Sequence, residues 1–240
     1  IYTDVDGVFT CDPRVVADAR KIPEIAYDEM LEMASSGTKV MQSRSVEFAK
    51  KFGVKFEVRN SMNHKPGTLV TEENKGMEAV VIRGVSLERD QAKVTIERVP
   101  DEPGVASSIF SCLAEAKLVI DMIVQNVSKT GVADISFTLN VADLPKAEEA
   151  LGVVLERFGD RVTVEGEGGV AKLSVVGIGM RSHSGVASKM FRSLAGAGIN
   201  IQMISTSEIK IAVIVGAEEV DAAACAVHEA FGLAEGSFVD

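Results

Sequence analysis

The stretch Gly104-Val105-Ala106-Ser107 decides the fold, because it returns 81 residues later as Gly185-Val186-Ala187-Ser188. Three further identities keep the same offset: Phe110 with Phe191, Leu113-Ala114 with Leu194-Ala195, and Ile120-x-Met122-Ile123 with Ile201-x-Met203-Ile204. Self-similarity at a fixed offset is the sequence signature of a repeated structural unit. We therefore predict a duplicated domain.

Each copy has the same order of expected elements. The β-branched, apolar runs 94–96 and 173–176 predict strands, and the apolar spacing after each glycine predicts helices over 104–117 and 185–197. Two strands, a second helix and, in the first copy, a closing strand follow: 119–127, 133–141, 144–158 and 162–164, then 200–206, 209–215 and 220–231. The order βαββαβ predicts a ferredoxin-like α+β sheet with two helices on one face.

The second copy lacks a closing strand. The apolar run 79–85 precedes the first copy and belongs to no expected element there. We expect a strand within 78–87 to complete the second sheet, which makes that domain discontinuous. The expected domains are thus 92–166 and 170–240, the latter completed by this strand.

Residues 1–75 have a different pattern. Helical stretches at 24–35 and 45–52 end at glycines, and strand-like runs at 39–41 and 54–58 follow them. Strand and helix alternation predicts the end of an α/β domain with a parallel sheet, and the polar run 71–75 predicts a linker.

Composition excludes several classes of protein. The 240 residues carry 25 basic and 35 acidic side chains, a net charge of −10, which argues against a nucleic-acid partner. No apolar run reaches the roughly 18 residues of a membrane span. Cys11, Cys112 and Cys225 lie far apart without a CxxC pair, which is typical of a reduced cytoplasmic protein with no bound metal. Because the chain opens at Ile1 in a strand-like run, we expect it to be part of a longer protein.

The first candidate site is the opening segment. Asp4, Asp6 and Asp12 could orient hydroxyls or a magnesium ion, and Arg14 could bind a phosphate oxygen, with Lys39 as a second positive charge. The other interpretation is an acidic turn with Arg14 as a surface charge.

The repeated glycine loops, 101–106 and 182–187, are the second candidate. Each enters a helix, whose exposed amides and dipole favour a carboxylate, while Asp121 could bind an amino group and Gln125 a side chain. Together these suit a free amino acid; the alternative is ordinary capping. Gly177-Ile178-Gly179 is not a dinucleotide site, because Ser182 stands where the third glycine is needed. His64, His183 and His228 lack metal-ligand spacing.

Several longer motifs resemble one family. TDVDGVFTCDPR at 3–14, GTKVM at 37–41, RSVEFAKKFGV at 44–54 and PGTLV at 66–70 resemble the end of the catalytic domain of aspartate kinases. The stretch 101–106, IDMIVQNVS at 120–128 and NIQMISTSEIKIAV at 200–213 resemble the two ACT regulatory domains that follow it. The resemblance runs nearly end to end and is to the single-function, lysine- and threonine-regulated type.

The resemblance implies an enzyme that phosphorylates the β-carboxylate of aspartate with Mg-ATP, the first step toward lysine, threonine, methionine and isoleucine. It implies ATP contacts from Thr3, Asp4, Phe9, Thr10, Cys11, Asp12, Pro13, Arg14 and Lys39. It implies effector contacts in the first ACT domain from Asp101, Glu102, Pro103, Gly104, Val105, Ala106, Val119, Ile120, Asp121 and Gln125. In the second, the matching residues are Val186, Ala187, Asn200, Ile201, Ser207 and Glu208.

Two positions depart from the family pattern: Phe9 replaces a frequent tyrosine and loses its hydroxyl, and Val119 replaces a common asparagine. The implied partners are lysine and threonine, and a second copy bound through the ACT domains or a larger assembly of α and β subunits. The family's amino-terminal KFGGTS stretch and aspartate-binding residues are not in this sequence, so we expect this chain by itself to be catalytically inert.

Two other functions remain open from sequence. A non-enzymatic amino-acid sensor would use ACT domains alone, which the resemblance at 3–14 opposes. A pair of RNA-binding domains would need basic and aromatic sheet faces, which the net charge of −10 and an aromatic content of 5% oppose.

Overall fold

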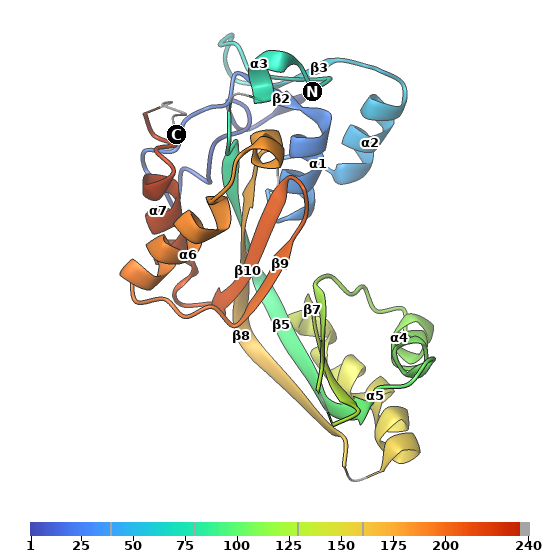
Figure 1. The fold of residues 1–240 in the computed structure, drawn as a ribbon. Coiled ribbons are helices and arrows are strands. Elements are labelled where there is room, and N and C mark those ends of the chain that lie inside the picture. The colour runs from blue at the N-terminus through green and yellow to red at the C-terminus, as the bar shows by residue number, and fades with distance from the viewer. Residues whose placement is uncertain (39, 79, 129, 160, 236–240) are drawn as a thin grey trace. The chain divides into compact units, whose positions relative to one another are not determined.

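The computed structural model describes residues 1–38, 40–78, 80–128, 130–159 and 161–235 (Figure 1). The chain forms two compact units. Unit 1 contains Ile1–Arg89 together with Lys172–Asp240, and unit 2 contains Asp90–Ala171. Two long strands, β5 (Gly84–Pro100) and β8 (Thr163–Val176), contribute residues to both units.

The first part of unit 1 is a four-stranded sheet in the order β1-β3-β4-β2. Its strands are β1 (Tyr2–Thr3), β2 (Glu24–Ala26), β3 (Phe56–Asn60) and β4 (Thr68–Thr71). β1 pairs with β3 and β2 with β4 in parallel, but β3 and β4 are antiparallel. The predicted parallel pairing is therefore confirmed for two of the three strand pairs and wrong for β3 and β4, because the short connection 61–67 returns the chain directly beside β3.

Two helices cover this sheet, α1 (Tyr27–Ser35) and α2 (Ser43–Lys51), and α3 (Lys75–Glu78) follows β4. The helix predicted from residue 24 begins three residues later, because Glu24–Ala26 pairs with β4 instead. Of the strand predicted over 39–41, residues 40 and 41 form a turn and a bend, and Lys39 lies outside the described residues. The predicted linker 71–75 instead includes the end of β4 and the start of α3.

The rest of unit 1 contains η2 (Ile178–Ser182), α6 (Val186–Gly196), β9 (Met203–Thr206), β10 (Lys210–Gly216) and α7 (Val220–Ala230). β9 and β10 are antiparallel, with Ile204 opposite Val213. β10 neighbours β8, which neighbours β5. α6 and α7 pack together, and Figure 1 shows them on the same side of β10. Both helices bury apolar stripes at helical spacing: Val186, Met190 and Leu194, and Val220, Ala223, Ala224 and Val227.

Unit 2 contains the later part of β5, α4 (Val105–Glu115), β6 (Ile123–Val127), β7 (Val132–Asn140), η1 (Val141–Asp143), α5 (Leu144–Phe158) and the start of β8. β7 pairs antiparallel with both β5 and β6. The helices pack together and cover a core that includes Ile96, Ile109, Phe137 and Leu151, each fully buried. The strand predicted over 94–96 is confirmed as part of β5. Of the strand predicted over 79–85, only Gly84 and Val85 belong to β5, residues 80–83 form no strand, and residue 79 lies outside the described residues.

Among the residues that the structure describes, no helix is both long enough and apolar enough to cross a membrane.

Candidate functional site

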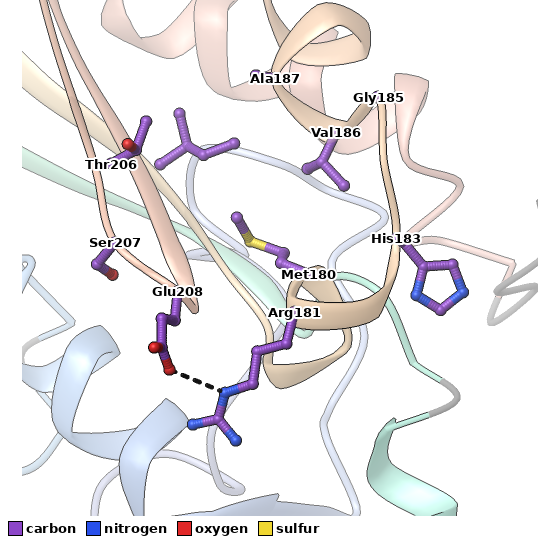
Figure 2. A pocket seen from close by; sticks show the side chains of 10 residues that line it. Met180, Arg181, His183, Gly185, Val186, Ala187, Thr206, Ser207 and Glu208 are labelled. Atoms are coloured by element: carbon purple, nitrogen blue, oxygen red, sulfur yellow. Dashed lines mark ion pairs between the residues drawn. The ribbon is translucent and has the colours of Figure 1, made fainter.

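A cavity of about 600 Å³ opens in unit 1 beside the second glycine loop (Figure 2). Three segments form it: η2 with the loop behind it, the first turn of α6, and the turn between β9 and β10. The lining residues are Met180, Arg181, His183, Gly185, Val186, Ala187, Thr206, Ser207, Glu208 and Ile211. The cavity therefore lies where the repeat predicted a ligand site.

One wall of the cavity is the start of a helix. Gly185 is the N-cap of α6 and has φ +89°, a left-handed conformation that favours glycine. An added Cβ there would have no neighbour within 4 Å, so the backbone is open on that side. The first amides of a helix have no intrahelical acceptor, and they carry the positive end of the helix dipole. This wall can therefore bind a carboxylate.

The other wall carries both signs of charge. Arg181 Nε lies 3.6 Å from Glu208 Oε2, and Arg181 Nη1 lies 3.1 Å from Glu73 Oε2 in the segment after β4. The Glu208 side chain is 84% exposed, so its ion pair with Arg181 is weak. Figure 2 shows Arg181 and Glu208 reaching toward each other at one end of the cavity, with Thr206 and Ser207 following the strand. Carboxylate, hydroxyl and helix amides together suit a zwitterion such as an amino acid.

His183 is not directed at this charged end. Its Nδ1 atom lies 2.8 Å from the Gly179 carbonyl oxygen, and its ring lies away from Arg181 and Glu208 (Figure 2). The histidine thus holds the loop against η2.

The structure places four of the six residues predicted for this site around the cavity: Val186, Ala187, Ser207 and Glu208. Asn200 and Ile201 do not line it. They lie before the start of β9, whereas the cavity is lined by Thr206 at the end of that strand and by the turn that follows. Sequence reasoning missed Met180, Arg181, Thr206 and Ile211. Arg181 could have been found from its place one residue before Ser182, at the start of the glycine loop.

The first glycine loop in unit 2 has the same backbone geometry. Gly104 is the N-cap of α4 with φ +95°, and an added Cβ would again have no neighbour within 4 Å. The loop residues Asp101, Glu102, Pro103 and Gly104 are exposed, whereas Val105 is buried and Ala106 half-buried. The Asp101 amide donates to the Gly131 carbonyl at 3.0 Å, which holds the loop against the β6–β7 turn.

The other residues predicted in unit 2 lie around β6. Val119 is 80% exposed, Ile120 is half-buried, and Asp121 and Gln125 are exposed. The Asp121 amide donates to the Thr138 carbonyl oxygen at 2.9 Å, so this backbone is fixed on β7. Because the exposed Val119 side chain has no hydrogen-bonding group, Val119 can offer a ligand only apolar contact and hydrogen bonds from its backbone.

The opening segment of unit 1 is folded around Asp12. Its carboxylate accepts from the Arg14 amide at 2.9 Å, from Arg14 Nε at 3.0 Å and from Arg14 Nη2 at 2.7 Å. These hydrogen bonds lower the pKa of Asp12 against the opposing effect of burial. The Arg14 side chain remains 85% exposed and can reach a phosphate oxygen.

The remaining residues predicted for the nucleotide divide into two groups. Asp4 and Pro13 are exposed, and Thr3 and Phe9 are half-buried, whereas Thr10 and Cys11 are 4% and 2% exposed. Thr10 and Cys11 therefore offer a ligand their backbone and not their side chains. Lys39 lies outside the described residues. An isolated antiparallel bridge between Phe9 and Lys21 closes this segment into one loop.

Asp6 has partners that the sequence did not reveal. Its Oδ1 atom accepts from Asn60 Nδ2 at 2.7 Å and from Asn63 Nδ2 at 2.8 Å, both at or just after the end of β3. Hydrogen bonds from Asn63 and then Asn60 lower the pKa of Asp6. The carboxylate thus stays ionised and fixes the loop 4–7 on β3. The parts of the chain that the structure describes contain no group of three His, Cys, Asp or Glu residues placed to hold a metal ion.

Comparison with known proteins identifies three segments. The amino acid kinase family model matches residues 1–60, and two ACT domain models match residues 94–156 and 173–231. The chain is similar to aspartate kinase Ask_LysC of Stutzerimonas stutzeri, with 49% identity over 97% of this chain and 57% of that protein. It is also similar to the aspartokinase of Helicobacter pylori, with 46% identity over 97% of this chain and 58% of that protein. The chain thus spans less than three fifths of these relatives.

Solved structures agree with these matches. The chain resembles the aspartate kinase of Clostridium acetobutylicum with a TM-score of 0.86 and 26% identity, over 96% of this chain and 53% of that one. It resembles the regulatory subunit of aspartate kinase from Thermus thermophilus with a TM-score of 0.59 and 40% identity, over 63% of this chain and 99% of that one. The predicted succession of a kinase fragment and two ACT domains is confirmed.

Proposed function

Because the chain belongs to the aspartate kinase family, we propose that it is the regulatory portion, with the end of the catalytic domain, of an enzyme that transfers phosphate from ATP to the β-carboxylate of aspartate. The relatives named aspartate kinase support this proposal over nearly the whole chain. The amino acid kinase match at residues 1–60 separates it from an amino-acid sensor built of ACT domains alone.

The cavity beside Gly185 is the observation that carries the regulatory role. It combines helix amides that suit a carboxylate with a glutamate and two hydroxyls that suit an amino group. Lysine and threonine fit this chemistry, and the first glycine loop repeats the backbone geometry at Gly104. A solved relative, E. coli aspartokinase III, has been crystallised with lysine and aspartate. Only different affinities of the effector for two arrangements of the enzyme can change its activity.

ATP would bind at the loop Phe9–Arg14, in which Pro13 and Arg14 are exposed. Arg14 would contact phosphate oxygens, and Thr3 and Asp4 would contact the nucleotide from the end of β1. The exposed guanidinium fits a phosphate group, whereas the buried Thr10 and Cys11 side chains keep the loop in place. The magnesium ion would arrive with the nucleotide and neutralise phosphate charge.

The sheet edges support assembly through the ACT domains. β6 and β9 are the edge strands, and Ile123, Val127 and Ile204 on them are 51%, 59% and 42% exposed. Exposed edges with apolar side chains are ready to pair with another copy. A homodimer, or an assembly of α and β subunits as in a solved aspartokinase, would cover them. Sedimentation of the chain at several concentrations measures this association.

The effector proposal is tested by calorimetry of this chain with lysine and threonine, alone and together. Binding is expected for at least one of them, and Arg181→Ala together with Glu208→Gln should weaken it. Asp121→Ala probes the first glycine loop in the same titration. Lysine and threonine both failing to bind would remove the regulatory proposal. The kinase proposal is tested separately, by aspartate-dependent ADP formation in the longer enzyme that contains this chain.

A further inference from the structure

A buried hydrogen bond connects the loop Phe9–Arg14 to the last helix. The Thr10 hydroxyl lies 2.9 Å from Nε2 of His228 on α7, although the two residues are 218 positions apart. Thr10 is 4% exposed and His228 is 2% exposed. A hydrogen bond shielded from water in this way holds its two ends more firmly than one at the surface.

Thr10 is a fixed point of its loop. Its amide donates to the Arg20 carbonyl at 2.8 Å, and its own carbonyl accepts from the Val85 amide at 2.7 Å. Its hydroxyl accepts from the Arg20 amide at 2.9 Å, which leaves the hydroxyl proton for the Nε2 lone pair of a neutral His228 ring. Removing the imidazole would leave this hydroxyl proton without its acceptor.

The same helix reaches the loop region at a second point. Cys225, one turn before His228, has its Sγ atom 3.6 Å from the Val15 carbonyl oxygen. Burial lowers the pKa of His228, and the Asp18 charge partly opposes this, so the ring next to Thr10 is neutral. α7 therefore contacts the segment 10–15 at two points, Thr10 through His228 and Val15 through Cys225.

α7 also packs against α6, whose first turn lines the effector cavity. Met190 and Leu194 of α6 and Val227 of α7 are fully buried. A shift of the α6 first turn on ligand binding would therefore act on the helix that holds Thr10.

We infer that His228 of the second ACT domain is a positioning residue for the nucleotide loop, and that it passes the state of the effector cavity to that loop through its hydrogen bond with Thr10. This inference rests on the proposed function, because it takes the loop Phe9–Arg14 as the nucleotide site. His228 is 2% exposed and bonds to the Thr10 hydroxyl, so in this proposal it acts through Thr10.

The test uses the longer enzyme with four variants: His228→Ala, His228→Gln, Thr10→Val and the double variant His228→Ala/Thr10→Val. His228→Ala and Thr10→Val should each raise the KM for ATP roughly three- to tenfold, the effect of one hydrogen bond, with the KM for aspartate unchanged. The double variant should be no worse than the worse single one, because both remove the same contact. His228→Gln, whose amide can still bond to the hydroxyl, should recover most of the loss.

The same variants are then titrated with the effector that inhibits the unmodified enzyme. Inhibition should weaken in His228→Ala and return in His228→Gln. His64→Ala, an exposed histidine outside these contacts, is the matched control and should behave as the unmodified enzyme.

Additive effects in the double variant, or equal losses in both KM values, would overturn the inference, since either would indicate a general loss of structure. If His228→Ala does not fold, Thr10→Val and His228→Gln decide alone. An unmodified enzyme with no aspartate kinase activity would reject the proposed function instead.

Discussion

Arg83 Nε donates a hydrogen bond to Glu29 Oε2 at 3.1 Å inside unit 1, where the Glu29 side chain is fully buried and that of Arg83 is 9% exposed. The Glu29 carboxylate also accepts from the Ala26 amide at 3.2 Å and from the Ile178 amide at 3.1 Å. One carboxylate thus joins the start of α1, the segment before β5 and the start of η2.

Glu29→Gln should lower the free energy of unfolding by about 3–5 kcal/mol, because it leaves the Arg83 charge buried without a counter-charge. Urea unfolding of this chain measures the loss. Glu229→Gln, at an exposed position on α7, is the matched control and should change stability by less than about 0.5 kcal/mol. A double apolar variant, Glu29→Leu with Arg83→Met, removes the unpaired charge but leaves the Ala26 and Ile178 amides without their acceptor, so it should regain only part of the stability. Equal effects of the two glutamine variants would contradict the assignment.

Substitution by alanine should destabilise the protein at two glycines for different reasons. At Gly185 the added Cβ meets no atom within 4 Å, so the left-handed φ of +89° alone should cost about 1–2 kcal/mol. At Gly177 the backbone is extended, but a Cβ would lie 2.2 Å from the Val81 carbonyl oxygen. Gly177→Ala should therefore cost more, about 3 kcal/mol. Thermal unfolding ranks the two variants, and the reverse order would contradict this account.

The buried His228 should make stability depend on pH. Burial lowers its pKa in the folded state below the unfolded value of about 6.5, so the folded state favours the neutral ring. The stability that the neutral His228 ring contributes to the folded state is then complete above about pH 6.5 and declines as the pH falls below that value. His228→Gln does not titrate and should lose less stability between pH 7.5 and 5.5. If the unmodified protein and His228→Gln lose the same stability across this pH range, as measured by their melting temperatures, the assignment is wrong.

Cys11 and Cys225 should differ in reactivity. Burial raises the pKa of Cys11 to about 12 and its side chain is 2% exposed, whereas Cys225 is exposed. Iodoacetamide at pH 8 should therefore label Cys225 first and Cys11 only after unfolding, because the thiolate is the reactive form. Peptide mass spectrometry over time gives the order. Labelling of Cys11 at the rate of Cys225 in the folded chain would contradict the buried position.

The repeat predicted that the two glycine loops share one local backbone. Gly104 and Gly185 share their neighbours in sequence, and both adopt left-handed backbones at helix starts. Such a turn depends on a few consecutive residues, so the sequence contains what determines it.

Features that depend on distant pairing were missed. Residues Glu24–Ala26 lie directly before a helix in the sequence. They form a strand because they pair with β4, where Ala26 lies opposite Thr71. Likewise, Met180 and Ile211 reach the cavity only because η2 and β10 meet there. The contact of Thr10 with His228 spans almost the whole chain, and no local pattern indicates it.

The division of the chain has a consequence for synthesis on the ribosome. Unit 1 takes its residues from both ends of the sequence, and unit 2 lies between them. Residues 90–171 can therefore reach their final form while the last third is still being translated, whereas the opening 89 residues must wait for the segment from Lys172 onward. During that interval Ala26 and Met77, which pack with Ile178 and Ile209 in the finished unit, lack these partners, and exposed apolar side chains of this kind bind chaperones or aggregate.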